Sequence, residues 1–185
     1  MIKSYLISDR AFYQPTVESF SNYLSHIYEN HEVDFACYRD KQSPYQEAFL
    51  ETFLKASHKQ KTLLHGNISL ASKFGFFGVH LSSTQFDEIP VAKEKNLFII
   101  ASTHSKEEVK LAKCLGADGV TFSPIFDTPN KGKAKGVGAL SELVSEVEIK
   151  VFALGGILTN QQIDACEASG AYGFASIRYF QSYKG

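Results

Sequence analysis

The chain has 185 residues, of which 44% are apolar and 21% are charged, and its formal net charge is −1. This length fits one domain with a sizeable core, and the near-zero charge argues against a nucleic-acid partner, which requires an extended basic surface. No apolar run approaches the ~18 residues of a membrane-spanning helix, and the first ten residues lack the long apolar region and small-residue cleavage site of a secretory signal, so no export is expected. We therefore expect a single cytoplasmic domain over residues 1–185 that binds neither nucleic acid nor membranes.

Short β-rich runs alternate along the chain with segments whose apolar residues recur at intervals of three and four. The strand-like runs cover residues 4–8, 33–38, 62–65, 78–82, 97–102, 119–126, 150–156 and 173–177. The helix-like segments between them cover residues 17–31, 45–60, 107–116, 140–147 and 160–170. Most of the strand-like runs are continuously apolar, which is typical of strands covered on both faces.

This alternation predicts a compact (β/α)8 barrel, the TIM-barrel fold. Gly-x-x-Gly spacings begin at Gly75, Gly116 and Gly170, each directly before a strand; the first glycine suits a left-handed helix end, and the second lets the chain enter the sheet tightly. Eight units leave about 23 residues each, so some helices must be short or missing. Pro90 makes a helix over residues 83–96 doubtful, and no full final helix is expected. An open doubly wound sheet is the alternative, although no GxGxxG turn follows the first strand.

The three cysteines show no sign of a metal site or a disulfide framework. Cys37, Cys114 and Cys166 are widely spaced, odd in number and outside any Cys/His ligand pattern. They are expected to be reduced thiols, most of them buried.

In a βα barrel the functional groups lie at the carboxyl ends of the strands. Gly155 and Gly156 end the seventh strand, and Ser176, Ile177 and Arg178 end the eighth. Paired glycines allow backbone N–H groups to close on an anion, and the phosphate site of this fold is commonly formed after these two strands. The five residues are therefore predicted to bind phosphate.

Two groups of charged residues stand at other strand ends. Arg39 ends an apolar strand, and burial of its guanidinium is costly unless an anion lies nearby, for which Asp40 is a candidate. Lys131, Lys133 and Lys135 lie in a glycine-rich loop after the sixth strand. We retain Lys131 as a ligand-binding residue and assign the other two lysines to solvent.

The stretch "GADGVTFSPIFDTPNKGKAKGVGAL", followed by "VFALGGI" and "GAYGFASI", resembles the thiamin phosphate synthase and TenI superfamily. "CYRDK" and "GVHLS" extend the resemblance over nearly the whole chain. It implies contacts with a pyrimidine diphosphate and a thiazole phosphate. The expected substrate-binding residues are Arg39, Lys41, Asn67, Ser102, Thr128, Asn130 and Lys131.

Two departures from the family pattern concern catalysis. In the synthases, the pyrimidine substrate loses diphosphate through a carbocation-like transition state, assisted by a Mg²⁺ ion that two aspartates hold. In this chain Gly66 and Gln85 stand at the positions of those aspartates, with Asn67 and Asp87 nearby. The tautomerases of the family move a proton with a histidine whose position is occupied by Pro124. The resemblance therefore implies altered catalytic positions for both subgroups.

Three histidines lie at strand ends and could carry a proton. His65 replaces an asparagine that faces the ligand in the family, so His65 and Lys131 are the candidate catalytic residues, against the alternative that His65 is a satisfied core or rim residue. His80 is interpreted as structural. His104 is also interpreted as structural, because it precedes a helix that Ser105 and Glu108 are expected to cap.

The favoured hypothesis is a TenI-like protein of thiamin biosynthesis that binds a thiazole phosphate, with proton transfer moved to His65 or lost. One alternative is a thiamin phosphate synthase with an atypical metal site, in which case Mg²⁺ is the cofactor; otherwise no cofactor and no metal ligand is predicted. A second alternative is a non-catalytic binder of a phosphorylated ligand. The expected partner is a small phosphorylated substrate, and a homo-oligomer is left open.

Overall fold

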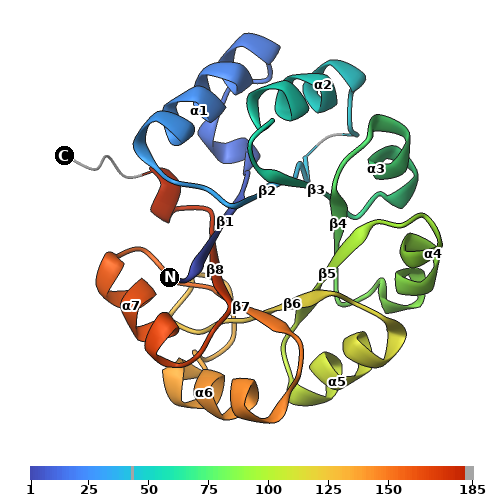
Figure 1. Cartoon of the computed structure of the whole chain (residues 1–185). Helices are drawn as coiled ribbons and strands as arrows, with labels where there is room; N and C mark the ends of the chain where they lie inside the picture. The colour runs from blue at the N-terminus through green and yellow to red at the C-terminus, as the bar shows by residue number, and fades with distance from the viewer. Residues whose placement is uncertain (43, 182–185) are drawn as a thin grey trace.

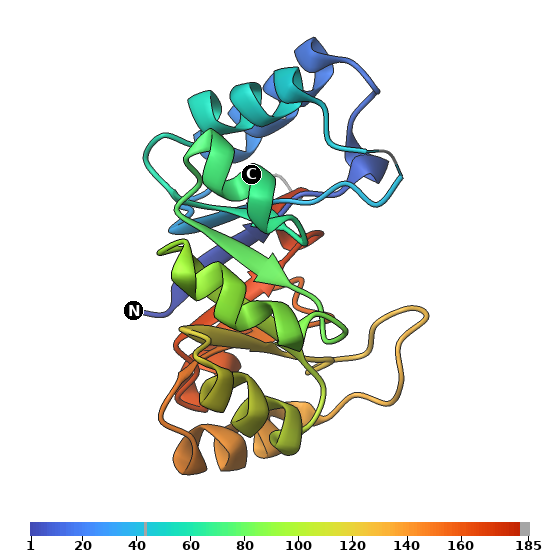
Figure 2. The same cartoon turned by 90° about the vertical axis from the view of Figure 1, so that its right-hand side faces the viewer.

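Eight parallel strands form a closed barrel in the computed structural model of the protein, which describes residues 1–42 and 44–181 (Figures 1 and 2). The strands are β1 Lys3–Ile7, β2 Phe35–Tyr38, β3 Lys61–His65, β4 Gly78–Leu81, β5 Phe98–Thr103, β6 Gly119–Phe122, β7 Lys150–Leu154 and β8 Gly173–Ser176. Each pairs with the next along the chain, and β8 pairs with β1 in the register Leu6 to Ser176. The predicted TIM barrel is confirmed, and the open-sheet alternative is wrong because the sheet has no edge.

Helices surround the barrel on its outside (Figure 1). They are α1 Val17–Asn30, α2 Glu47–Ala56, α3 Ile68–Phe74, α4 Ile89–Glu94, α5 Lys106–Leu115, α6 Gly136–Glu146 and α7 Asn160–Ala168. Short 3-10 turns are η1 Arg10–Phe12, η2 Phe86–Glu88 and η3 Tyr179–Gln181; η3 follows β8, and residues 182–185 lie outside the described residues. Within residues 1–42 and 44–181, no helix is both long and apolar enough to cross a membrane.

The helix α4 corrects an expectation based on Pro90. The proline was expected to interrupt a helix in this region, but it occupies the first turn of α4. Proline is tolerated there because the first N–H groups of a helix have no intrahelical acceptor, and its fixed φ suits the helix. No helix was predicted for the segment that forms α3. This helix begins at Ile68, directly after the capping residue Asn67, whose side chain accepts a hydrogen bond from Leu70 N at 2.9 Å.

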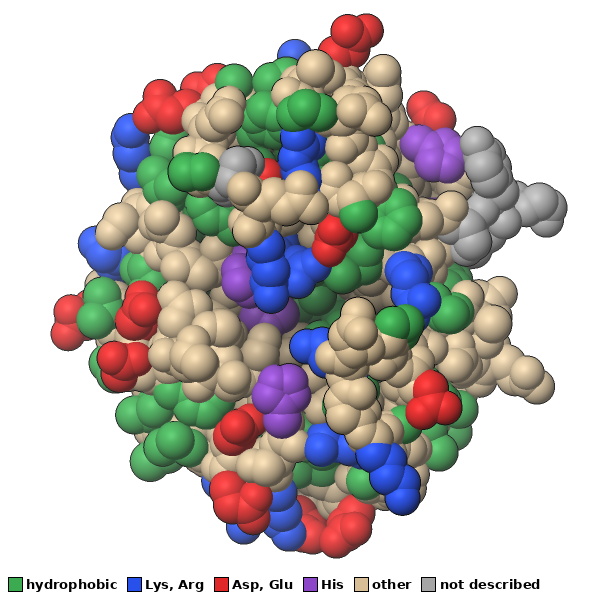
Figure 3. Space-filling model, turned by 180° about the vertical axis from the view of Figure 1, so that it is seen from behind, with side chains coloured by type: hydrophobic (Ala, Val, Ile, Leu, Met, Phe, Trp, Pro, Cys, Tyr) green, Lys and Arg blue, Asp and Glu red, His purple; other side chains and the backbone are tan. Residues whose placement is uncertain are grey.

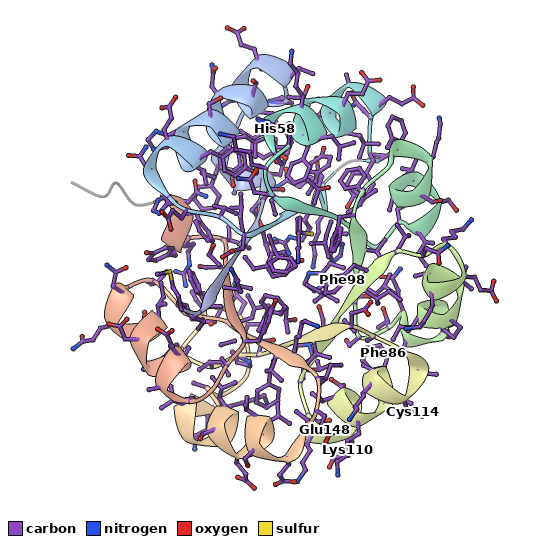
Figure 4. All side chains as sticks on the ribbon, in the orientation of Figure 1. His58, Phe86, Phe98, Lys110, Cys114 and Glu148 are labelled. Carbon is purple, nitrogen blue, oxygen red and sulfur yellow. The ribbon has the colours of Figure 1, made fainter. Side chains whose placement is uncertain are left out.

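Aromatic side chains fill the amino end of the barrel. The ring of Phe98, which is directed into the barrel in Figure 4, lies 6.0 Å from that of Phe35, and Phe35 lies 5.3 Å from Phe152. Tyr5 is fully buried, with its ring 5.4 Å from that of Phe152. By contrast, Cys114 is an exposed free thiol at the outer rim of the molecule (Figure 4), while the other two cysteines are buried. The aromatic layer closes one end of the barrel, so a ligand site is expected at the other.

The Gly-x-x-Gly spacing has the two roles expected from the sequence. Gly116 ends α5 in the left-handed region at φ 103°, and Gly173 begins β8 in close contact with the aromatic layer. A Cβ on Gly173 would lie 2.4 Å from Cδ1 of Phe152 and 2.8 Å from the carbonyl oxygen of Lys3. The second glycine is therefore required for space rather than for backbone conformation.

The substitution Gly173→Ala is expected to lower the free energy of unfolding by about 1–3 kcal/mol, the usual cost of overpacking a core. The added methyl group must displace either a buried ring or a strand backbone. Urea unfolding followed by circular dichroism measures the change. Gly132→Ala is the matched control, because nothing lies within 4 Å of its Cβ position. Equal stability of the two variants would contradict the packing argument.

Candidate functional site

A cavity of about 580 Å³ opens at the carboxyl ends of the strands. Figure 3 looks onto this end and shows Lys, Arg and His side chains gathered around the centre of the face. The described polar and glycine residues that line the cavity are Asp9, Arg39, Lys41, His65, His80, Ser82, Ser83, Ser102, His104, Ser123, Thr128, Lys131, Gly155, Gly156, Ser176 and Arg178. Four cationic side chains and one carboxylate belong to this set, so the cavity is strongly positive.

Most of the residues predicted for the site meet at this cavity. The residues that line it are His65, Arg39, Lys41, Ser102, Thr128, Lys131, Gly155, Gly156, Ser176, Ile177 and Arg178. Asn67 and Asn130 are not among the lining residues of the described chain. The side chain of Asn67 caps α3 instead, and Asn130 is an exposed loop residue with a positive φ of 60°.

The ion pairs around Arg39 differ from the expected one. Arg39 donates to Asp9 at the end of the neighbouring strand β1, whereas Asp40 faces Arg10 at 3.7 Å. The predicted pairing of Arg39 with Asp40 is therefore wrong: both residues follow the end of β2, but Arg39 lines the cavity beside Asp9, whereas Asp40 lies against Arg10 and is not among the described lining residues. The Nε atom of Arg39 is buried and has no hydrogen-bond partner among the described residues.

The basic groups at the cavity repel one another. Burial lowers the pKa of Lys41, and the charges of Arg39 and Lys131 lower it further. The pKa of His65 falls to about 4, first because the ring is buried and then because Arg39 and Lys41 lie nearby. His65 is therefore neutral at pH 7. An anion in the cavity would relieve this repulsion.

Gly155 and Gly156 hold the turn that follows β6 against the end of β7. Both have positive φ values, 99° and 69°, and a Cβ on Gly156 would lie 2.6 Å from the carbonyl oxygen of Asp127. Backbone hydrogen bonds join Ile125 N to the Leu154 oxygen at 2.9 Å and Phe126 N to the Gly155 oxygen at 3.0 Å. The lysine-bearing loop is thus anchored at its base.

Two hydroxyl groups at the cavity already have partners in the backbone. Ser176 donates to the carbonyl oxygen of Ile157 at 2.9 Å and accepts from Tyr179 N at 3.2 Å. Thr128 donates to the carbonyl oxygen of Phe126 at 2.9 Å. These hydroxyl groups stabilise the walls of the cavity.

His104, interpreted as structural, also lines the cavity, and its Nδ1 lies 3.2 Å from the backbone carbonyl oxygen of Ser123.

A buried hydrogen-bonded chain that was not predicted from the sequence lies below the cavity. Nδ1 of His80 lies 2.8 Å from the Tyr5 hydroxyl oxygen, and Nε2 of His80 lies 2.9 Å from Oγ of Ser102. The ring of His65 lies above this chain, 5.7 Å from the His80 ring. Tyr5 stands in an apolar strand whose pattern predicts only core packing. Its role could be found only by knowing which side chain faces it across the barrel.

The residues at the positions that hold Mg²⁺ in the resembling synthases do not fit that ion. Gln85 and Gly66 are close together, as the resemblance implies, with Gln85 Nε2 donating to the Gly66 oxygen at 3.0 Å. Gln85 also donates to Glu88 at 3.0 Å and accepts from Ser82 N at 3.1 Å, so its amide is occupied by protein partners. Mg²⁺ is usually held through one or two carboxylates. Glu88 is not among the described lining residues, and the described chain has no cluster of three His, Cys, Asp or Glu residues that could hold a metal.

The protein is a (β/α)8 barrel with a positive cavity at the carboxyl ends of its strands. A family model described as thiamine monophosphate synthase matches residues 4–180, and the chain belongs to this family. It is 38% identical over 130 residues to a putative thiamine-phosphate synthase 2 of Aquifex aeolicus, covering 69% of each chain. It is 34% identical over 125 residues to a putative thiamine-phosphate synthase of Geobacter sulfurreducens, covering 63% of this chain and 57% of that relative.

A solved structure agrees with the sequence relatives. The thiamine phosphate pyrophosphorylase from Pyrococcus furiosus superposes with a TM-score of 0.75 at 26% identity, covering 97% of this chain and 91% of that one. The relatives thus carry synthase names, which supports the synthase alternative better than the TenI-like hypothesis favoured from the sequence.

Proposed function

We propose that the protein joins a hydroxymethylpyrimidine diphosphate to a thiazole phosphate and releases diphosphate. In this reaction the thiazole nitrogen forms a bond to the methylene carbon of the pyrimidine as the carbon–oxygen bond to the diphosphate breaks. The electron pair of that bond leaves with the diphosphate, and the thiazole nitrogen becomes cationic. The names of the relatives support this reaction class.

The observation that carries the proposal is the convergence of four cationic side chains and one carboxylate on the cavity. Arg39 and Lys41 follow β2, and Lys131 lies in the loop after β6; the pKa of Lys41 is lowered by burial and by the charges of the other two. Positive charge aimed at a leaving diphosphate stabilises the charge that develops there. We assign these three side chains to the diphosphate, where they take over charge neutralisation that carboxylate-bound Mg²⁺ would otherwise supply.

The part of the cavity formed by the ends of β7 and β8 is assigned to the phosphate of the thiazole. Gly155 and Gly156 have the left-handed backbone that lets successive N–H groups form an anion-binding nest, and Arg178 lines the same wall. Apolar side chains of Ile7, Leu154 and Ile177 also line the cavity and suit an aromatic ring.

One observation favours a second candidate function, the tautomerisation of a thiazole carboxylate phosphate. His65 is neutral and faces the cavity, so it can accept a proton. A pKa of about 4 makes a weak base at neutral pH, since the best general base has a pKa near the working pH. A bound phosphate would offset the charges of Arg39 and Lys41 and raise the pKa of His65 toward its ordinary range.

The test is a reaction of the full chain with both half-substrates, followed by mass spectrometry of thiamin phosphate and by assay of released diphosphate. We expect product, inorganic pyrophosphate binding in calorimetry with and without EDTA, and a decrease of both in Lys131→Met that is smaller than the effect of removing Arg39. Lys133→Met is the matched control from the same loop, because Lys133 is not among the described lining residues.

Three outcomes would contradict the proposal in different ways. Strict dependence of pyrophosphate binding on Mg²⁺ would remove the role assigned to the three cations. Binding of thiazole phosphate alone, with turnover of the carboxylate that is lost in His65→Ala, would support the tautomerase. Binding of thiazole phosphate with no turnover of either kind would leave a non-catalytic phosphate binder.

A further inference from the structure

The buried chain of Tyr5, His80 and Ser102 connects the aromatic layer of the barrel to the floor of the cavity. Tyr5 and His80 are 0% and 2% exposed, and their rings are stacked with centroids 5.8 Å apart. Both nitrogens of the His80 ring are engaged, Nδ1 with Tyr5 at 2.8 Å and Nε2 with Ser102 at 2.9 Å. Ser102 and His80 also line the cavity, so the chain ends where a ligand would lie.

The direction of these hydrogen bonds follows from the chemistry of the groups. Burial holds the pKa of His80 well below its ordinary value, so the ring is neutral and carries one N–H. Burial also raises the pKa of Tyr5 well above its ordinary value, so its hydroxyl group remains protonated and needs an acceptor. The nearby thiol of Cys37 offers only a weak sulfur acceptor, whereas an imidazole nitrogen is a strong one.

The Tyr5 hydroxyl group therefore donates to Nδ1 of His80, and the ring proton lies on Nε2. That proton is donated to Oγ of Ser102, which leaves the hydrogen of Ser102 available for a group in the cavity. In the opposite direction Ser102 would donate to His80 and turn only lone pairs toward the cavity. Lone pairs directed at the cavity would repel an anion, whereas the free hydrogen of Ser102 attracts one.

We propose that Tyr5 is a positioning residue that acts through His80 to present Ser102 as a hydrogen-bond donor to the departing diphosphate. The proposal rests on the proposed function for the identity of the anion. Tyr5 does not touch the ligand; it determines which ring nitrogen of His80 carries the proton. Ser102 touches the diphosphate, and its O–H group adds to the charge provided by Arg39, Lys41 and Lys131.

The first test reads the tautomer of His80 directly. ¹⁵N NMR of the full chain, without ligand, is expected to show an Nε2-protonated ring for His80, identified by comparison with His80→Gln. In Tyr5→Phe the preference is expected to weaken, because Nδ1 loses its donor. A wild-type ring protonated on Nδ1 would overturn the proposal whatever the protein binds, and this measurement on the wild type does not depend on whether any variant folds.

The second test measures the binding of inorganic pyrophosphate by calorimetry. Ser102→Ala is expected to raise Kd about tenfold, as loss of one hydrogen bond to a charged oxygen should. Tyr5→Phe is expected to raise Kd several-fold, and the double variant should bind no more weakly than Ser102→Ala. Tyr28→Phe is the matched control: it removes another buried hydroxyl group, bonded to Ser57 at 2.5 Å, that does not line the cavity.

The outcomes separate this proposal from the proposed function. If the wild type binds pyrophosphate but the effects of Tyr5→Phe and Ser102→Ala multiply in the double variant, Tyr5 acts independently of Ser102 and only the positioning role fails. An equal loss in Tyr28→Phe would also overturn it, because general destabilisation would then explain the effect. If the wild type binds no pyrophosphate at millimolar concentration, both the diphosphate site and the role assigned to Ser102 fail.

Discussion

Replacing Arg39 by methionine is expected to weaken pyrophosphate binding by about a hundredfold, the largest effect of any single side chain at the cavity. Charge-assisted hydrogen bonds contribute about 1.5–3 kcal/mol each, and 1.4 kcal/mol corresponds to a factor of ten in Kd. Arg39 pairs with Asp9 through one terminal nitrogen, while its Nε is buried without a partner among the described residues. The guanidinium thus retains donors for an anion. Methionine keeps much of the apolar length of the side chain and removes the charge.

The effect of Arg39→Met extends to its neighbours. The pKa of Lys41 and that of His65 are both lowered in part by Arg39, so removal of the guanidinium should raise both values. The change in His65 is measurable by NMR titration. A fall in pyrophosphate affinity without a rise in the His65 pKa would mean that Arg39 is not directed at the cavity as described.

Arg10→Met is the matched control for this prediction. Arg10 is also an arginine beside an aspartate, with its Nε 3.7 Å from Asp40, but it is not among the described residues that line the large cavity. We expect its pyrophosphate Kd to match that of the wild type. If the two variants lose affinity equally, the argument for a specific anion site at Arg39 fails, and the net charge of the protein would account for binding.

The parts of the fold that were predictable follow from local rules. Apolar runs separated by amphipathic segments predicted all eight strands, because a parallel strand that is covered on both faces consists almost entirely of apolar residues. Paired glycines at Gly155 and Gly156 were recognisable because few other residues tolerate their backbone conformation. Most of the residues predicted at the strand ends line one cavity, and their roles there stay predictions.

The parts that were missed depend on contacts between distant residues. Asn67 stands at a strand end, but it also precedes a helix, and the capping bond to Leu70 takes its side chain out of the cavity. Asp9 and Arg39 are neighbours only because β1 and β2 pair in a particular register, so the adjacent Asp40 was the more obvious partner. The hydroxyl group of Tyr5 acquires a role only when the barrel closes and brings β4 opposite β1.

The stability of the protein is expected to fall as the pH is lowered from 6.5 to 4, and His65 should account for part of the loss. The folded state holds the pKa of His65 at about 4, against an ordinary value of 6.5, because the ring is buried beside Arg39 and Lys41. Between these values the unfolded chain binds more protons, so acid favours unfolding; above pH 6.5 the full stability is present. The shift corresponds to no more than about 3 kcal/mol, lowered by the partial exposure of the ring.

The experiment compares urea unfolding of the wild type and His65→Gln at a series of pH values. His80 also faces His65, and its own depressed pKa adds to acid destabilisation in both proteins, so only the difference between the two curves reports on His65. That difference should favour the glutamine variant increasingly from pH 6.5 to 4 and be constant above pH 6.5. His58→Gln, at an exposed histidine near the end of α2 (Figure 4), is the control and should follow the wild type. Parallel curves for the wild type and His65→Gln over the whole range would show that His65 is not buried beside Arg39 and Lys41, and its placement at the cavity would then be wrong.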